Sequence, residues 1–247
     1  DGVVQFEKVT FSYPGAESPV LHRISFTAKP GEVTAVIGGT GSGKSTLLDL
    51  IPRFYDVNQG RITLDGIDIR DMTQEELRSR IGYIPQKAVL FSGTIDQNIR
   101  RGKQTATEEE VKRAAQIAQA ADFIEEKEDG YESYISQGGT NVSGGQKQRL
   151  SIARALVRQP KVYLLDDTFS ALDYKTDARL RTEFGKAADD STIIVVAQRI
   201  STVLHANQII VLETGKVVGK GTHDELMESC HVYREIVASQ FSEEAVS

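Results

Sequence analysis

Gly38-Gly-Thr-Gly-Ser-Gly-Lys-Ser45 is the stretch of sequence that decides the fold of this chain. A glycine, four further residues and then Gly-Lys-Ser is the spacing of a phosphate-binding loop. The β-branched run from Val33 to Ile37 before it predicts a buried strand, and the residues from Thr46 to Ile51 behind it predict the start of a helix. Because strand, glycine loop and helix form the context that this motif requires, we interpret it as a phosphate-binding loop rather than a glycine-rich turn with an exposed lysine.

The chemistry of such a loop follows from its backbone. Glycines let the chain form a concave turn whose N–H groups point at phosphate oxygens, and the helix N-terminus behind it adds a partial positive charge. The Lys44 ammonium is expected to reach the β- and γ-phosphates of a nucleotide, and the Ser45 hydroxyl to bind Mg²⁺. The residues expected to bind the nucleotide here are Gly38, Gly39, Thr40, Gly41, Ser42, Gly43, Lys44, Ser45 and Thr46.

The composition is that of an ordinary globular chain. Of the 247 residues, 39% are hydrophobic and 26% are charged, so disorder is not the default. The net charge of −6 argues against a nucleic-acid surface. The single cysteine, Cys230, excludes an internal disulfide and fits a reducing compartment. No apolar run approaches the roughly 20 residues that span a bilayer, and no signal peptide is visible. Because the chain starts at Asp1 in strand-like sequence, we expect a piece of a longer protein, although processing would leave the same start.

Two carboxylates follow a second buried run. Val162 to Leu165 predicts a strand, and Asp166 and Asp167 come directly after it. An aspartate at the carboxyl end of such a strand lies where α/β sheets bind ligands. Asp166 can hold Mg²⁺ through its water shell, and Asp167 can face an attacking water. The alternative is helix capping by the turn that follows, which the presence of a phosphate loop makes the weaker interpretation.

Three further motifs allow two interpretations each when the residues are taken alone. Tyr13, in the loop before Pro14, could stack on a nucleobase, but ordinary edge packing is the better interpretation. Gln86, just past a predicted strand, could reach a metal or a water, but a solvated loop glutamine is the better interpretation. Ser143-Gly144-Gly145 opens a predicted helix and is either a plain helix cap or a site for phosphate on a second molecule.

These motifs together resemble the ATPase domain of ABC transporters over essentially the whole chain. The phosphate loop, Gln86, the run Ser143 to Gln146 and the run Leu164 to Asp166 occur in the order and spacing of that family. The resemblance implies that Tyr13 stacks on adenine and that Ser45, Gln86 and Asp166 bind Mg²⁺. It also implies that a signature sequence in this chain completes the ATP site of a second ATPase domain. The turn from Ser170 to Asp173 would link the two ATP sites. The signature residues are Ser143, Gly144, Gly145 and Gln146.

A second phrase is similar to the exporter branch of the family. It consists of Leu90-Phe91-Ser92-Gly93-Thr94-Ile95 followed by Asn98-Ile99. In exporters this helical region meets the cytoplasmic ends of the membrane helices. The resemblance therefore implies transmembrane domains as partners, a place on the cytoplasmic face of the cell membrane, and no nucleic acid as a partner.

Two departures from the family pattern concern catalysis. The family usually has glutamate directly after the Asp166 position, where this chain has Asp167, and a switch histidine where it has Gln198. Glutamine can donate a hydrogen bond to a γ-phosphate, but it cannot gain a proton. Both changes affect the composite site built on Lys44, whereas the signature is intact except for Val142, where leucine is commoner. The candidate catalytic residues are thus Asp167, Gln198 and Lys44.

These departures suggest the degenerate-site half of a heterodimeric bacterial multidrug-type exporter. The chain would bind ATP and Mg²⁺ tightly, hydrolyse ATP slowly, and lend its signature to a competent site on a different chain. The alternatives are a fully active homodimeric exporter ATPase, a soluble nucleotide-dependent switch acting on nucleic acid or ribosomes, and an ATP-binding regulatory module without hydrolysis.

The expected fold class is α/β. We expect a RecA-like parallel core sheet around the phosphate loop and an antiparallel β subdomain near the N-terminus, with a hairpin around Asp65-Gly66. Helices predicted over 94–100, 108–121 and 145–158 form an inserted helical subdomain. The whole of 1–247 is then one ABC ATPase domain, with a core of 1–86 and 159–247 and a helical subdomain of 87–158.

Overall fold

The computed structural model describes residues 1–168 and 172–244 of the chain. Its internal contacts divide it into two compact units. The first unit consists of Asp1–Ile81 with Asp190–Ser247, and the second of Gly82–Asp189. The phosphate loop belongs to the first unit, and the paired aspartates and the signature belong to the second.

An antiparallel sheet forms the N-terminal part of the first unit. Its strand order is β2-β1-β4-β5, with β1 at Val4–Phe11, β2 at Leu21–Ala28, β4 at Gln59–Leu64 and β5 at Ile67–Asp68. Alternate residues of β1 are buried, as expected for a sheet with one face on the core. The predicted hairpin is confirmed: β4 and β5 flank Asp65 and Gly66, whose φ angles of 51° and 82° suit a tight hairpin turn.

The phosphate loop follows β3, which belongs to a second set of strands in the same unit. The neighbouring strands are, in order, β12 (Lys216–Gly221), β11 (Gln208–Glu213), β3 (Val33–Gly38) and β10 (Thr192–Val196). β3 runs parallel to both β10 and β11, while β11 and β12 form an antiparallel hairpin. Every residue of β10 is buried, which fits a parallel strand covered on both faces. The helix α1 (Lys44–Leu50) follows β3 directly.

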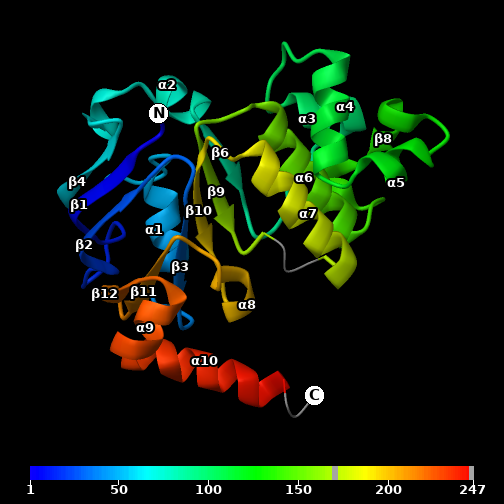
Figure 1. Ribbon diagram of the computed structural model, residues 1–247. Helices are drawn as coiled ribbons and strands as arrows, with labels where there is room; N and C mark the ends of the chain where they lie inside the picture. The colour runs from blue at the N-terminus through cyan, green and yellow to red at the C-terminus, as the bar shows by residue number, and fades with distance from the viewer. Residues whose placement is uncertain (169–171, 245–247) are drawn as a thin grey trace. The chain divides into compact units, whose positions relative to one another are not determined.

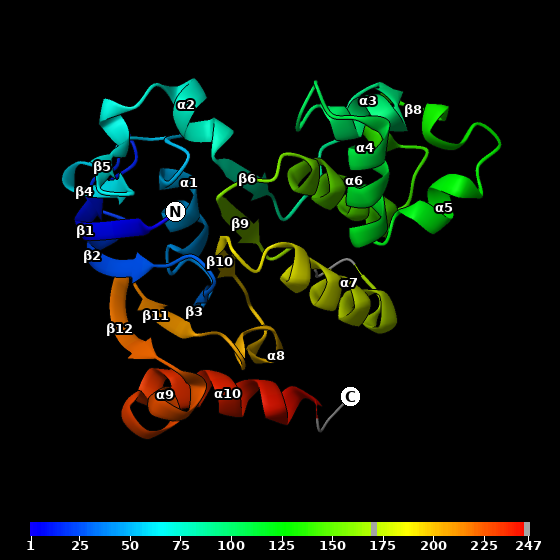
Figure 2. The ribbon, with the colours of Figure 1, turned by 45° about the horizontal axis from the view of Figure 1, so that its top comes forward.

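The remaining helices of the first unit are short except for the last one. They are η1 (Ile69–Asp71), α2 (Gln74–Ser79), α8 (Ile200–Val203), α9 (His223–Ser229) and α10 (His231–Glu244). Figures 1 and 2 both show α9 and α10 beside the β11–β12 hairpin. Tyr233 of α10 is fully buried, and its hydroxyl lies 2.7 Å from Nδ1 of His223, which ties α10 to α9.

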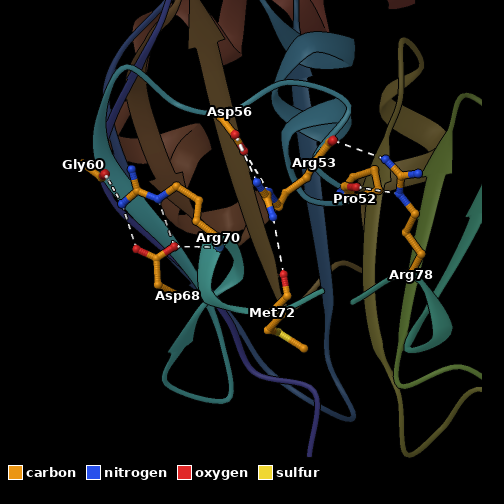
Figure 3. A network of polar contacts seen from close by, with 8 residues as sticks. All are labelled: Pro52, Arg53, Asp56, Gly60, Asp68, Arg70, Met72 and Arg78. Atoms are coloured by element: carbon orange, nitrogen blue, oxygen red, sulfur yellow. Dashed lines mark hydrogen bonds and ion pairs between the residues drawn. The ribbon is translucent and has the colours of Figure 1, made fainter. Parts of the chain in front are cut away.

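A polar network holds the backbone that follows α1 (Figure 3). The Arg78 guanidinium donates to the carbonyl oxygens of Pro52 and Arg53, at 3.0 and 3.3 Å. Arg53 in turn pairs with Asp56 at 2.8 Å. The segment is therefore fixed although Phe54 is 47% exposed.

The second unit combines two pairs of strands with a group of helices. β6 (Ile81–Ile84) and β9 (Val162–Asp166) are neighbours, and β7 (Gly93–Thr94) pairs with β8 (Tyr134–Ile135). In the helical part, α6 packs against α3 and α4. The helices of the second unit are α3 (Ile95–Arg100), α4 (Glu108–Ile117), α5 (Ala121–Glu125), η2 (Gly130–Glu132), η3 (Gln137–Gly139), α6 (Gly144–Val157) and α7 (Tyr174–Ala187).

The helix predicted over 108–121 is wrong in its extent, because two helices occupy this stretch. α4 ends at Ile117, and Gln119 adopts a left-handed φ of 60°. The Ala120 N–H donates to Ala115 O at 2.8 Å and the Gln119 N–H to Gln116 O at 3.1 Å, the two bonds of a Schellman motif. The alanine spacing continues through this break, so the hydrophobic pattern alone did not reveal it.

Candidate nucleotide-binding site

The glycines of the phosphate loop have separate structural roles. Gly41 and Gly43 adopt φ angles of 76° and 101°, which side chains other than glycine rarely tolerate. Gly38 lies so close to β11 that a Cβ there would be 2.4 Å from Leu212 O. A Cβ on Gly39 or Gly41 would meet nothing within 4 Å, so the backbone of the loop is bare on that side. This bare backbone is what a phosphate requires for close approach.

Lys44 extends back along the loop from the first turn of α1. Its side chain is largely buried, and its ammonium donates to Gly38 O at 2.5 Å and to Gly39 O at 3.0 Å. Two loop carbonyls thus hold the charge beside the bare backbone. Ser45, which follows, is exposed.

Ser42 provides a test of whether the loop suits a phosphate. In the part of the chain that the structure describes, its Oγ is buried and has no hydrogen-bond partner. Buried hydroxyls are normally paired, so an unpaired one in this loop fits the arrival of an acceptor such as a phosphate oxygen. The residues present therefore fit a nucleotide phosphate.

A cavity of about 570 Å³ lies against the loop within the first unit. The loop residues 38–42 and Lys44 line it, together with Gln198, the end of β11 and one side of α10. Its volume is within the roughly 300–1,000 Å³ of small-molecule sites. The structure thus brings Gln198, which follows β10, to the same cavity as Lys44.

Tyr13 adopts the packed arrangement rather than an open one. Its hydroxyl lies 2.6 Å from Oγ1 of Thr46, and its ring meets the edges of Phe11 and Tyr55 at centroid distances of 5.0 and 5.2 Å. It is half-buried and is not among the residues that line the 570 Å³ cavity. Edge packing is therefore present, and Tyr13 is linked to α1 through Thr46.

The second unit brings Gln86 and Asp167 together. Gln86 Nε2 donates to Asp167 Oδ2 across 3.4 Å, a long hydrogen bond. Asp166 is the last residue of β9 and is buried, and Asp167 has a left-handed φ of 46°. Such a φ is unfavourable for a non-glycine residue, and backbone strain of this kind is concentrated at functional sites.

Thr168 helps to hold the segment that carries Asp167, a role that the sequence analysis did not predict. It is 1% exposed, and its hydroxyl donates to Ile84 O at 3.1 Å. This bond joins the segment after β9 to the end of β6, two residues before Gln86. A threonine after two aspartates carries no sequence signal of this role, because its partner is 84 residues away.

The three predicted Mg²⁺ ligands are divided between the two units. Ser45 is in the first, and Gln86 and Asp166 are in the second. Among the described residues, no group of three or more His, Cys, Asp or Glu side chains is arranged to hold a metal. The hydroxyl, amide and carboxylate oxygens of the three predicted ligands are nevertheless the type that Mg²⁺ prefers.

The signature sequence caps α6. Ser143 Oγ accepts from Gln146 N at 3.1 Å, and Gln146 Oε1 accepts from Ser143 N at 3.1 Å, which is a capping box. The plain cap is thus present. Ser143 and Gly144 are also exposed, the space around Gly144 is open, and no acidic residue lies in the first turn. An anion on another molecule could approach this helix N-terminus, so the two interpretations are compatible.

The turn predicted to link two sites is described only in part. Ser170 and Ala171 lie outside the described residues. Asp173 caps α7, with Oδ1 accepting from Thr176 N at 2.9 Å. This hydrogen bond holds the pKa of the Asp173 carboxyl below its usual value.

The exporter-like phrase is organised by one buried amide. Asn98 is 3% exposed; its Nδ2 donates to Phe91 O at 2.9 Å and Thr94 O at 3.0 Å, and its Oδ1 accepts from Phe91 N at 2.9 Å. Val89 and Phe91 are 52% and 40% exposed, and the Arg101 guanidinium lies 3.7 Å from the Phe91 ring centre. Asn98 therefore fixes a loop that presents apolar side chains.

No helix within residues 1–168 and 172–244 has both the length and the apolar character needed to cross a membrane.

Comparison with known proteins identifies relatives over nearly the whole chain. An uncharacterized ABC transporter ATP-binding protein of Mycobacterium tuberculosis is 50% identical over 242 residues, which are 97% of this chain and 41% of that protein. A putative multidrug export ATP-binding/permease protein of Bacillus subtilis is 44% identical over 97% of this chain and 41% of its own length. A beta-(1→2)glucan export ATP-binding/permease protein of Rhodopseudomonas palustris is 44% identical, with 97% and 40% covered. The chain spans about two fifths of these relatives.

A solved structure and a family profile agree with these relatives. The structure of a bacterial Atm1-family ABC exporter with ATP bound matches with a TM-score of 0.93 and 39% identity, over 97% of this chain and 42% of that one. This match confirms the predicted mixed α/β fold, with its antiparallel β subdomain, P-loop-type sheet and helices. The profile described as ABC transporter matches residues 21–170. The chain, with its phosphate loop, its paired aspartates and its capped signature helix, therefore belongs to the ABC transporter family.

Proposed function

We propose that this chain is the ATPase domain of an ABC exporter, in which ATP binding and hydrolysis drive export through attached transmembrane domains. The observation that carries the proposal is the 570 Å³ cavity, because it joins the bare phosphate loop, the Lys44 ammonium and Gln198. The likeness to an ATP-bound exporter at 39% identity supports it. On this proposal, 1–247 is a single ATPase domain with a helical subdomain over 87–158.

Each polar group then has one task at the nucleotide. The loop N–H groups and Lys44 bind the β- and γ-phosphates, and Gln198 donates a hydrogen bond to the γ-phosphate. Ser45, Gln86 and Asp166 would hold Mg²⁺, which supplies charge neutralisation at the phosphates when bound. Asp167 orients the attacking water. Tyr13 would leave its edge contacts to stack on adenine.

The signature would act on a second ATPase domain. The exposed N-terminus of α6, with Ser143 and Gly144, would bind the phosphates held by the partner's loop, and this chain's loop would face the partner's signature. Closure of the pair around ATP would then drive the membrane domains. Apolar side chains suited to that contact are exposed in each unit: Phe54 and Tyr55 in the first, Val89 and Phe91 in the second. We therefore place the domain on the cytoplasmic face of the cell membrane, without nucleic acid as a partner.

We further propose that the site built on Lys44 is the weak site of a heterodimer. Asp167 is one methylene shorter than glutamate, so its carboxylate reaches less far towards an attacking water. Gln198 cannot take up a proton. The partner chain should carry glutamate and histidine at the matching positions, so that this chain's intact signature completes the competent site.

An ATP titration of the chain with and without Lys44 tests the nucleotide site. We expect Lys44→Ala to weaken ATP–Mg²⁺ binding about 10- to 100-fold, because a hydrogen bond from a charged group contributes roughly 1.5–3 kcal/mol. Lys29→Ala removes an exposed lysine of the same unit and should leave the affinity unchanged. Equal affinities for the Lys44→Ala and Lys29→Ala variants would contradict the assignment.

A further inference from the structure

One side chain of the last helix bridges the backbone on both sides of Arg199. Gln240 Nε2 donates to Gln198 O at 2.6 Å, and Gln240 Oε1 accepts from Ile200 N at 2.7 Å. The Ile200 contact lies within the usual N–H···O range of about 2.7–3.2 Å, and the Gln198 contact is slightly shorter. The residues joined are 42 and 40 apart in sequence, so a single amide couples α10 to the segment between β10 and α8.

The hydrogen bond from Ile200 N to Gln240 Oε1 replaces the side-chain cap that α8 (Ile200–Val203) lacks at its N-terminus. Arg199 is the N-cap residue of α8, and its side chain caps nothing. A four-residue helix leaves its first N–H groups without intrahelical partners, so an acceptor must come from elsewhere. Gln240 supplies it for Ile200 and at the same time binds the carbonyl of Gln198.

The segment that carries Gln198 is therefore held at both ends. Upstream, Ala197 N donates to Val36 O at 3.1 Å, on the strand that leads into the phosphate loop. Downstream, Gln240 holds the Gln198 carbonyl and the Ile200 N–H. The Gln198 side chain itself is exposed and lines the cavity beside Lys44. Its reach towards a γ-phosphate depends on where these two anchors hold its backbone.

The helix that supplies Gln240 is itself firmly anchored. Tyr233 is fully buried and bonded to His223, and Val237 is 6% exposed. Arg234 Nη1 donates to the carbonyl oxygens of Met227 and Glu228 at the end of α9, both at 3.0 Å. One side of α10 also lines the 570 Å³ cavity. The support for Gln198 thus extends through α10 to α9.

We propose that Gln240 is a positioning residue for hydrolysis at this chain's own ATP site, acting by holding the backbone of Gln198. The inference rests on the proposed role of Gln198 at the γ-phosphate. It makes α10 part of the catalytic apparatus rather than a closing element of the fold. A displacement of about 1 Å in a positioning group can cost about a hundredfold in rate.

A double-mutant cycle in the assembled exporter tests this proposal. The Asp167→Glu background is used, so that turnover at this site is large enough to measure. There we expect Gln240→Ala to lower kcat about 10- to 100-fold and to leave the KM for ATP within about twofold, because the phosphate loop is untouched. In a Gln198→Ala background the same change should have no further effect, since Gln240 acts through Gln198.

Two additional variants keep the test decisive. Gln240→Glu preserves the side-chain shape and the acceptor for Ile200 but removes the donor to Gln198 O, so it should lower kcat. Because Gln240 lines the 570 Å³ cavity, this change also adds a negative charge there and, unlike Gln240→Ala, should raise the KM for ATP. Ser242→Ala is the matched control on α10, because the Ser242 hydroxyl donates only to Ser239 O of its own helix. It should leave kcat unchanged.

The outcomes separate the inference from the function on which it rests. If Gln198→Ala lowers kcat and both Gln240 variants behave like Ser242→Ala, the positioning role is wrong and the function of Gln198 stands. A loss caused by Gln240→Ala that persists undiminished in the Gln198→Ala background also contradicts the positioning role. If Gln198→Ala leaves kcat unchanged, the proposed function of Gln198 is wrong, and the positioning role of Gln240, which depends on it, is wrong as well.

Discussion

Two side-chain amides, the buried Asn98 and the partly buried Gln240, each hold backbone groups in place. Asn98 and Gln240 each form hydrogen bonds with the backbone of two residues and fix a loop to which we assign a function. Both use an N–H and a C=O of the same side chain, which is the capacity that distinguishes amides from carboxylates and amines. Neither could be replaced by a charged residue of similar size without losing one of the two roles.

Asn98→Ala should destabilise the second unit by about 2–3 kcal/mol. The change leaves the Phe91 N–H and two carbonyl groups without their partner, and an unsatisfied buried group costs roughly 1–3 kcal/mol. Urea unfolding measures the loss. Gln116→Ala, at an exposed amide on α4, is the control and should change stability by less than about 0.5 kcal/mol. Equal effects of the two changes would show that Asn98 does not organise the loop.

The sequence predicted what depends on local rules. The strand, glycine loop and helix around Lys44 and the hairpin at Asp65-Gly66 each follow from a few adjacent residues, and the structure contains both. The cap at Ser143 is one of the two interpretations that its residues allow, and it is present. The contacts it could not predict are long-range: Thr168 with Ile84, and Gln240 with Gln198. No spacing rule links such pairs, because the fold alone brings them together.

At the scale of elements, the residues at helix ends, rather than those in helix interiors, determine where the helices of this chain begin and end. The break at Gln119 was missed because helical periodicity does not report a Schellman motif when glutamine occupies the left-handed position. The capping boxes on α3 and α6, by contrast, follow from the Thr/Ser-x-x-Gln spacing. The cap on α6 has a structural role in this chain and, on our proposal, a binding role for its partner.

Ser143→Ala and Thr107→Ala separate these two roles. Ser143 and Thr107 are N-caps whose side chains accept from the N–H three residues on, at 3.1 Å each. Loss of either cap should cost about 1 kcal/mol in thermal or urea unfolding. Only Ser143→Ala should also lower ATP turnover at the partner's site in the assembled exporter, by about tenfold or more. If the two variants reduce turnover alike, α6 has no special role at the partner's nucleotide.

For the molecule as a whole, acidic pH should weaken the first unit in a defined way. Hydrogen bonds from Arg70 lower the pKa of Asp68, and hydrogen bonds from Arg53 lower the pKa of Asp56 (Figure 3). A carboxyl whose pKa is lower in the folded state stabilises the fold above its unfolded pKa of about 4. This stabilisation is lost as the pH falls through the folded pKa.

Thermal unfolding of Asp68→Asn against the unaltered chain measures this effect. Asparagine keeps the acceptor for the Arg70 N–H, so the cap of η1 remains. Because the Arg70 side chain is 41% exposed and solvent screens the pair, we expect a deficit of at most about 1 kcal/mol at pH 7. The deficit should shrink below about pH 4. A deficit that is the same at pH 7 and pH 3 would contradict an electrostatic origin.

At the scale of the whole molecule, we propose that the chain is one half of an ATP-driven pair. Its phosphate loop and its signature are intact, whereas Asp167 and Gln198 depart from the residues that hydrolysis favours. On our proposal, this chain's own site binds ATP tightly but hydrolyses it slowly, and its signature completes the competent site of a partner. The central claim is therefore that catalysis at this chain's own loop is limited by these two residues.

Steady-state ATP turnover tests that claim most directly. It is measured for the unaltered chain alone, for the chain with a partner domain that carries glutamate and histidine, and for Asp167→Glu combined with Gln198→His alone. We predict slow turnover for the unaltered chain, and a rise of about a hundredfold both with the partner and in the double variant. Fast turnover of the unaltered chain alone, at the rate of the double variant, would contradict the account and indicate a fully active homodimer.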